Sequence, residues 1–238
     1  MEQGMPIKKI VKELGISIQT SFEWRHKILN SLIQFVPESL SSEVACDELE
    51  LALSNKGSRS LERKPSKQGN DFNRNQGKEE STVIQVVTAV ERNGGAKYLK
   101  AVESKRLSKE EITKALDGRL SDDATLITDK HPSYKPFSKD HPSIKHKALL
   151  ANDHVDKKDA SIHLQKVNNT SSQLRKFIHP FNGVISKYLQ KYLNWFAYVD
   201  QIRNNKSTLK QWLITILLSD QANQLFQLFK LSAVIIRT

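Results

Sequence analysis

The sequence predicts an α/β protein in which a mixed sheet is flanked by helices and preceded by a small helical segment. Three observations support this class. Apolar residues recur at helical spacing over residues 6–29, a dense β-branched hairpin pattern covers 83–102, and a helix is followed by a strand at 108–129. Strands and helices that alternate in this way form a mixed sheet with helices packed on it.

Two short helices are expected at the N-terminal end. Residues 6–15 have apolar side chains at helical spacing, and Gly15 suits a C-terminal cap. Residues 18–29 follow Ser17, a suitable N-cap, and carry an apolar face that includes Phe22. Helices joined by a glycine turn predict a helix-turn-helix whose second helix enters the major groove, although an ordinary helical hairpin with a solvated basic face would give the same pattern.

Polar and basic residues of the second helix are the candidate DNA contacts. Its polar front would touch base edges or phosphates, and its basic residues would touch the backbone. These candidates are Gln19, Thr20, Ser21, Arg25 and Lys27. The aromatic residues expected in the core rather than on a base-stacking surface are Trp24, Tyr188, Tyr192, Trp195 and Phe196.

Charge points to a polyanionic partner. The 238 residues include 37 Lys and Arg against 26 Asp and Glu, a net charge of +11, and neutralising phosphates releases condensed counterions. No run approaches the roughly 20 apolar residues of a spanning helix, since the longest run in the tail is 212–218. Cys46 is the sole cysteine, so a disulfide and a cysteine-cluster zinc site are excluded, and no signal-peptide core is seen. A cytoplasmic protein is expected.

A basic loop and a hairpin occupy the middle of the chain. Residues 54–77 lose the apolar signal and gain basic residues, including Lys56 and Arg59, so they predict either a loop that closes over a DNA backbone or a solvated linker. Residues 83–90 and 97–102 then form a hairpin. The next helix begins with a capping box, Ser108 at the cap and Glu111 three residues on.

Two aspartates follow short apolar runs and are the candidate metal ligands. Asp47 comes after residues 44–46, and Asp129 ends the strand expected at 124–128. A carboxylate at a strand end is poorly placed for packing and well placed to hold a cation at the edge of a sheet. Magnesium prefers carboxylate oxygens, and paired ions serve phosphodiester chemistry. The pair therefore predicts a magnesium site.

Several motifs together resemble a known family. The chain is similar to a bacterial insertion-sequence transposase group of the DDE superfamily, in which a zinc ribbon and a helix-turn-helix precede a ribonuclease-H-like catalytic domain. The motifs that carry the resemblance are residues 4–10, 20–29, Asp47-Glu48, 54–57, Thr128-Asp129, 163–168, 174–177, 181–184 and 187–196.

The resemblance implies a DNA transposase that cleaves and joins insertion-sequence ends by two-metal hydrolysis and strand transfer. Asp47 and Asp129 would be the first two metal-binding acids, holding two Mg²⁺ or Mn²⁺ ions. The expected partner is double-stranded DNA, both element ends and target. A homodimer or larger transposition complex and a nucleoid-associated location in a bacterium would follow.

The family's third catalytic position departs from its acidic pattern. It aligns with Ser171, and no Asp or Glu occurs in residues 160–199. A hydroxyl is a poor magnesium ligand, so Asn168 or Asn169 would have to substitute. The basic residue that follows this position in the family would be Arg175 or Lys176.

The zinc ribbon of the family is not found, so we expect an N-terminally truncated chain that binds no zinc. The predicted domains are a helix-turn-helix segment at 1–36, a ribonuclease-H-like catalytic domain at 37–200 and a helical tail at 201–238. Two alternatives stay open: a degenerate transposase that binds DNA without cutting it, and a helix-turn-helix regulator with an appended domain.

Overall fold

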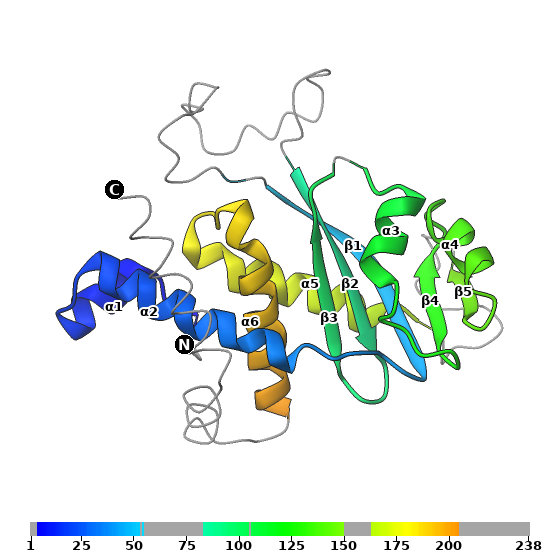
Figure 1. Ribbon diagram of the computed structural model, residues 1–238, viewed down its shortest axis with the longest axis horizontal. Helices are drawn as coiled ribbons and strands as arrows, with labels where there is room; N and C mark the ends of the chain where they lie inside the picture. The colour runs from blue at the N-terminus through cyan, green and yellow to red at the C-terminus, as the bar shows by residue number, and fades with distance from the viewer. Residues whose placement is uncertain (1–3, 53, 55–82, 105, 150–162, 205–238) are drawn as a thin grey trace, which may run out of the picture.

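The computed structural model describes residues 4–52, 54, 83–104, 106–149 and 163–204. The predicted basic loop with Lys56 and Arg59, and the tail from residue 205 onward, lie outside these residues. The elements, labelled in Figure 1, are α1 (Ile7–Leu14), α2 (Ile18–Ser31), the 3-10 helix η1 (Leu32–Phe35), β1 (Glu43–Ala52), β2 (Val83–Glu91), β3 (Lys97–Val102), α3 (Lys109–Leu116), β4 (Thr125–Asp129), α4 (Tyr134–Asp140), β5 (Lys145–Leu149), α5 (Gln165–Ile178), the 3-10 helix η2 (His179–Phe181) and α6 (Ser186–Asn204).

The strands form one mixed sheet in the order β3-β2-β1-β4-β5. The first three are antiparallel, while β1, β4 and β5 are parallel. The predicted mixed α/β fold and its hairpin are thus confirmed. So is the capping box of α3, in which the Glu111 backbone N–H donates to Ser108 Oγ at 3.3 Å and the Ser108 N–H donates to Glu111 Oε2 at 2.8 Å.

Helices cover both faces of the sheet, with α3 and α4 on one face and α5 and α6 on the other (Figure 1). Side chains of β1 alternate between the faces. Val44 and Cys46 pack with α3 and α4, whereas Ala45 packs with α5 and Leu49 with α5 and α6. Asp47 therefore faces the α5 side of the sheet.

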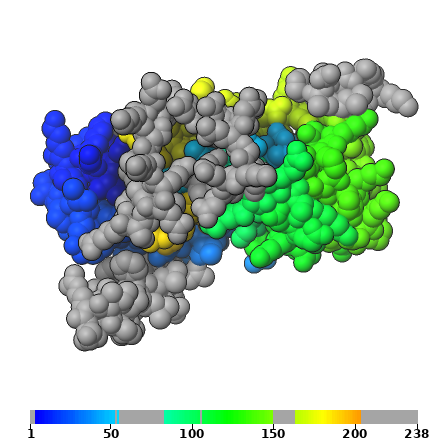
Figure 2. Space-filling model, turned by 90° about the horizontal axis from the view of Figure 1, so that it is seen from above, coloured from blue at the N-terminus to red at the C-terminus, as the bar shows by residue number. Residues whose placement is uncertain are grey.

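The two N-terminal helices form as expected. Gly15 adopts the left-handed conformation at φ 65°, which a glycine accepts without strain, and Ser17 Oγ accepts the Thr20 backbone N–H. The N-terminal helices lie at the end of the molecule opposite α4 and β5 (Figure 2). They share a cluster with α6 that contains Leu29, Leu32, Phe181, Tyr192, Trp195 and Val199.

Three features extend beyond the expectations. Neither α4 nor β5 was expected, and β5 adds a fifth strand beside β4. Helix α6 continues to Asn204, past the predicted boundary at residue 200. Within the described part of the chain, every helix is too short or too polar to span a lipid bilayer.

Candidate functional site

The two aspartates lie on adjacent parallel strands. Asp129 is the last residue of β4, as expected. Asp47 was expected to end its strand, which is wrong, because β1 continues to Ala52. The residues after Asp47 alternate glutamate and leucine, and this period of two is typical of a strand. The polar composition of the segment made that strand signal easy to overlook.

The strand register brings the two carboxylates together. Cys46 pairs with Thr128, so the next residues along the parallel pair, Asp47 and Asp129, lie side by side. Their carboxylates and that of Glu48 each offer an oxygen, and these three oxygens lie within 4.8 Å of one another. The predicted pair of acids is therefore a cluster of three in the structure.

Glu48 was not among the residues expected to bind the metal. Alternation along β1 directs it to the α4 face, opposite to Asp47. There its Oε2 accepts the Tyr134 hydroxyl at 3.3 Å, and its Oε1 lies 3.6 Å from His131 Nε2. Its position next to Asp47 in the sequence was the signal for a shared site. Alternation along a strand places neighbouring residues on opposite faces, and this argued against such a site.

The cluster concentrates negative charge in a partly buried place. Burial, with Asp129 nearby, raises the pKa of Asp47 to about 6, although the Glu48 backbone N–H partly opposes this. Burial and the charges of Asp129 and Asp47 raise the pKa of Glu48 to about 7. In the described part of the chain no lysine or arginine forms an ion pair with any of the three. Closely spaced carboxylate oxygens that are not paired with a basic side chain are a donor set that fits a hard divalent ion.

Helix α5 carries Ser171, the residue expected at the family's third catalytic position, on the side that faces β1. Val167 packs in one cluster with Ala45, and Leu174 packs in another with Leu49. Ser171 lies between Val167 and Leu174 on the same buried stripe of α5 and therefore faces the part of β1 that carries Asp47. Its side chain is buried, and its hydroxyl has no hydrogen-bond partner among the described residues. Asn168 and Asn169 are exposed on α5.

Two predicted DNA contacts, Ser21 and Arg25, are corrected by the structure. Both are buried, because this side of α2 packs against α6. The Arg25 guanidinium lies 5.6 Å from the ring centroids of Phe181 and Trp195 and donates to the Tyr192 hydroxyl at 3.4 Å. It also donates to the Met5 carbonyl oxygen. Arg25 is thus a packing residue, although the basic pattern of the helix suggested a DNA contact.

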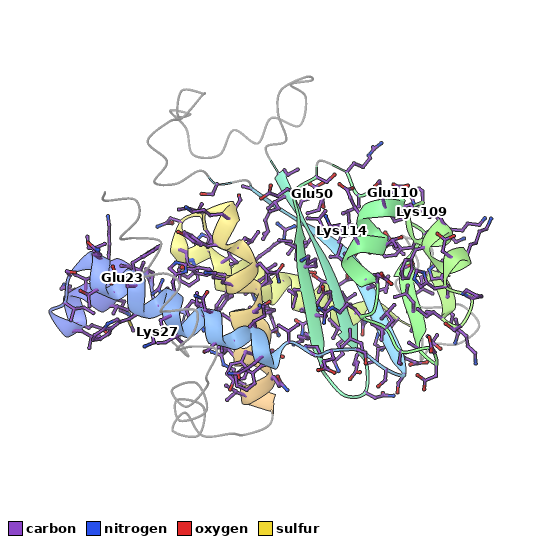
Figure 3. All side chains as sticks on the ribbon, viewed as in Figure 1. Glu23, Lys27, Glu50, Lys109, Glu110 and Lys114 are labelled. Carbon is purple, nitrogen blue, oxygen red and sulfur yellow. The ribbon has the colours of Figure 1, made fainter. Side chains whose placement is uncertain are left out.

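Other candidates on α2 remain accessible. Gln19 is exposed and donates to Glu23, while Thr20 and Lys27 are half-buried. Glu23 and Lys27 mark this helix in Figure 3. Trp24 was expected in the core, which is wrong, because its side chain is 55% exposed.

Among the described residues, the remaining predicted DNA contacts lie on α5, and the remaining aromatic residues lie on α6. Arg175 and Lys176 are exposed on α5. The aromatic residues that pack in the core, as expected, are Tyr192, Trp195 and Phe196, with Tyr188 partly buried against them.

The mixed five-stranded sheet with neighbouring acids on its parallel strands β1 and β4 is the α/β arrangement that the resemblance to a DDE transposase led us to expect. Residues 40–200 match the model of the ISXO2-like transposase domain, which covers more than half of the chain. The chain belongs to that family of insertion-sequence transposases. No curated protein matches it.

Solved structures show only distant likeness. A chain of the simian T-cell lymphotropic virus intasome in complex with PP2A regulatory subunit B56 gamma is 12% identical, with a TM-score of 0.39, over 84% of this chain and 65% of that one. The HTLV-2 integrase catalytic core domain in complex with magnesium (dimeric form) is 12% identical, with a TM-score of 0.35, over 67% and 84%. The pre-cleavage Mos1 transpososome is 9% identical, with a TM-score of 0.31, over 83% and 75%. The chain therefore spans 65% of the length of the first of these.

Proposed function

We propose that this protein is a DNA transposase that cleaves and joins insertion-sequence ends with divalent metal ions held by Asp47 and Asp129. The observation that carries the proposal is the convergence of their carboxylates, with that of Glu48, within 4.8 Å at the end of β4. Mg²⁺ or Mn²⁺ is the expected cofactor, because these ions prefer carboxylate oxygens.

The proposed chemistry has two steps. A water oxygen bonds to phosphorus and loses a proton while the bond from phosphorus to the 3′ oxygen breaks, and the departing 3′ oxygen takes up a proton to become a 3′-hydroxyl. This hydroxyl then attacks a target phosphodiester and displaces its 3′ oxygen. The chemistry that bound divalent ions supply is polarisation of the phosphate and activation of the attacking oxygen. Asp47 and Asp129 would hold and orient these ions. Ser171 on α5 would occupy the family's third position.

Double-stranded DNA is the proposed partner, and a dimer or larger complex is expected. Exposed Arg175 and Lys176 lie on α5, the helix that carries Ser171, and would contact phosphates. Gln19 and Lys27 on α2 would contact a second part of the duplex. The net charge of +11 favours such a partner.

The test is a cleavage and strand-transfer assay on the element's own terminal sequences with Mg²⁺ or Mn²⁺. We expect activity in the wild type and a loss of about 10³-fold or more in Asp47→Asn and Asp129→Asn, because such acids act as one unit. Glu50→Gln, on the same strand, is the matched control and should keep activity. Bound but uncut DNA in the wild type would reject the proposed chemistry.

A second candidate function is DNA binding without cleavage, as in a degenerate transposase. The observation that favours it is the sequence of α5, which contains no acid between Gln165 and Ile178. The same assay separates the two, because this candidate predicts DNA binding that is equal with and without metal and no cleaved product.

A further inference from the structure

Glu48 and Tyr134 occupy the face of β1 opposite to α5, and the proposed metal chemistry above does not use them. Tyr134 is fully buried at the start of α4. Its hydroxyl donates to Glu48 Oε2 at 3.3 Å and lies 3.5 Å from Cys46 Sγ. A buried tyrosine that places its only polar atom on a carboxylate fixes the direction of that carboxylate.

His131 lies near the other oxygen of Glu48. Its Nδ1 accepts the Ser133 backbone N–H at 3.4 Å, and its Nε2 lies 3.6 Å from Glu48 Oε1. The His131 backbone N–H also donates to Asp129 Oδ1 at 3.0 Å. One short segment, the turn from β4 into α4, therefore contacts two of the three acids.

Glu48 reaches the other acids because β4 ends. The parallel pairing of β1 with β4 is recorded up to Cys46 and Thr128, and β4 terminates at Asp129. Glu48 lies one residue beyond the level of Asp129, where no strand of the described residues pairs with β1 on that side. Its side chain can therefore turn around the open end of the sheet toward Asp47 and Asp129.

A buried hydroxyl on the α5 side points independently to a ligand at this cluster. Thr88 is directly opposite Asp47 on β2 and is fully buried. Directly opposed residues project from the same face with their Cβ atoms about 5 Å apart, so the Thr88 side chain is a neighbour of the Asp47 side chain on the α5 face. Neither Thr88 Oγ1 nor Ser171 Oγ has a partner in the part of the chain that the structure describes. A hydrated cation between the acids would supply the missing partners.

We propose that Glu48 is the third metal-binding carboxylate of this protein, in place of an acid on α5, and that Tyr134 is the residue that positions it. The inference rests on the proposed metal function. It explains how a member of the family keeps three acidic ligands although Ser171 occupies the third position. The third acid comes from the strand that carries the first one.

Metal binding by the purified full chain tests the inference without relying on activity. Mg²⁺ and Mn²⁺ are titrated by calorimetry at pH 8. We expect Glu48→Gln to weaken binding at least about tenfold, and Tyr134→Phe, which keeps the ring packing, to weaken it about tenfold, as loss of a group that orients a ligand does. Glu50→Gln changes the same charge two residues along β1 and should bind as the wild type does (Glu50 is labelled in Figure 3).

The outcomes separate the two proposals. Loss of binding in Asp47→Asn and Asp129→Asn together with wild-type binding in Glu48→Gln would overturn the role of Glu48 and leave the metal function standing. Absence of binding in the wild type would overturn both. Thermal unfolding without metal checks folding, since Glu48→Gln removes a crowded charge and should unfold no earlier than the wild type. If Glu48→Gln does not fold, Tyr134→Phe decides: wild-type affinity in that variant overturns the positioning role.

Discussion

The guanidinium of Arg25 lies 5.6 Å from the centroid of the Trp195 ring, which joins α2 to α6. Arg25 is 2% exposed, and its hydrogen bonds go to Tyr192 and to the backbone of Met5. An arginine stacked on aromatic rings and withdrawn from water is a strong contact between elements. The residue that resembled a DNA contact therefore attaches the N-terminal helices to α6, which packs on the sheet.

Replacing Arg25 should destabilise the protein. We expect Arg25→Ala to lower the free energy of unfolding by about 2–3 kcal/mol, because it removes the stacked guanidinium and leaves the Tyr192 hydroxyl without its donor. Urea denaturation followed by circular dichroism measures this. Lys9→Ala, which removes an exposed basic residue of α1, should change stability by less than about 0.5 kcal/mol. Equal stability of the two variants would contradict the packing role.

His26 should make the docking of α2 sensitive to acid. Burial lowers its pKa from 6.5 to about 4, and Lys191, Arg25 and Lys187 add to the shift. Because the folded-state pKa lies below the unfolded value, only the unfolded chain takes up the proton as the pH falls from 6.5 to 4. Stability is therefore lost across that window. Measured over this range, the unfolding free energy of wild type should fall more steeply than that of His26→Phe, which keeps the ring and cannot titrate.

Metal binding should strengthen as the pH rises from 6 to 8. The pKa values of Asp47 and Glu48, about 6 and about 7, lie above their usual values, so the metal-free fold retains protons that a cation must displace. For the same reason the metal-free protein loses stability as the pH rises from about 4 through about 7. The Mg²⁺-induced rise in melting temperature should be larger at pH 8 than at pH 6. A rise independent of pH would show that these carboxylates do not meet the ion.

The two tryptophans of α2 and α6 should respond differently to truncation. Trp195 is fully buried, so Trp195→Ala should cost about 3–5 kcal/mol or prevent folding. Trp24 is 55% exposed, so Trp24→Ala should cost less than about 1 kcal/mol. Denaturation curves of the two variants give both values. A large loss of unfolding free energy in Trp24→Ala would instead support the place in the core that the sequence suggested for Trp24.

Phosphate contacts from α5 should appear in the salt dependence of DNA binding. Arg175→Ala and Lys176→Ala should each weaken binding for all sequences and reduce the salt slope by about 1. Lys114→Ala is the control, because Lys114 is exposed on α3, on the opposite face of the sheet (Figure 3). Fluorescence anisotropy at several salt concentrations measures the slopes. Slopes equal to that of the wild type in both α5 variants would show that Arg175 and Lys176 do not contact DNA phosphates.

Local patterns predicted most of the elements and two of the three clustered acids. The capping box at Ser108, the hairpin after Val83 and the strand end at Asp129 depend on neighbouring residues, and sequence order carries that information. Strand β5 was missed because its sequence is mainly exposed and basic, which gives little apolar signal. Trp24 was misplaced because helical spacing does not show which face of a helix will meet a partner.

The sequence by itself determined the order of most elements, the basic charge and the two aspartates that were expected to share one site. Only the tertiary structure decided that Arg25 is buried and that Glu48 joins the acids. Both results depend on residues far apart in the chain: the aromatic rings of α6 in one case, the end of β4 and the Tyr134 hydroxyl in the other. Packing between elements selects which polar groups leave water, and residue spacing along a single element cannot reveal that choice.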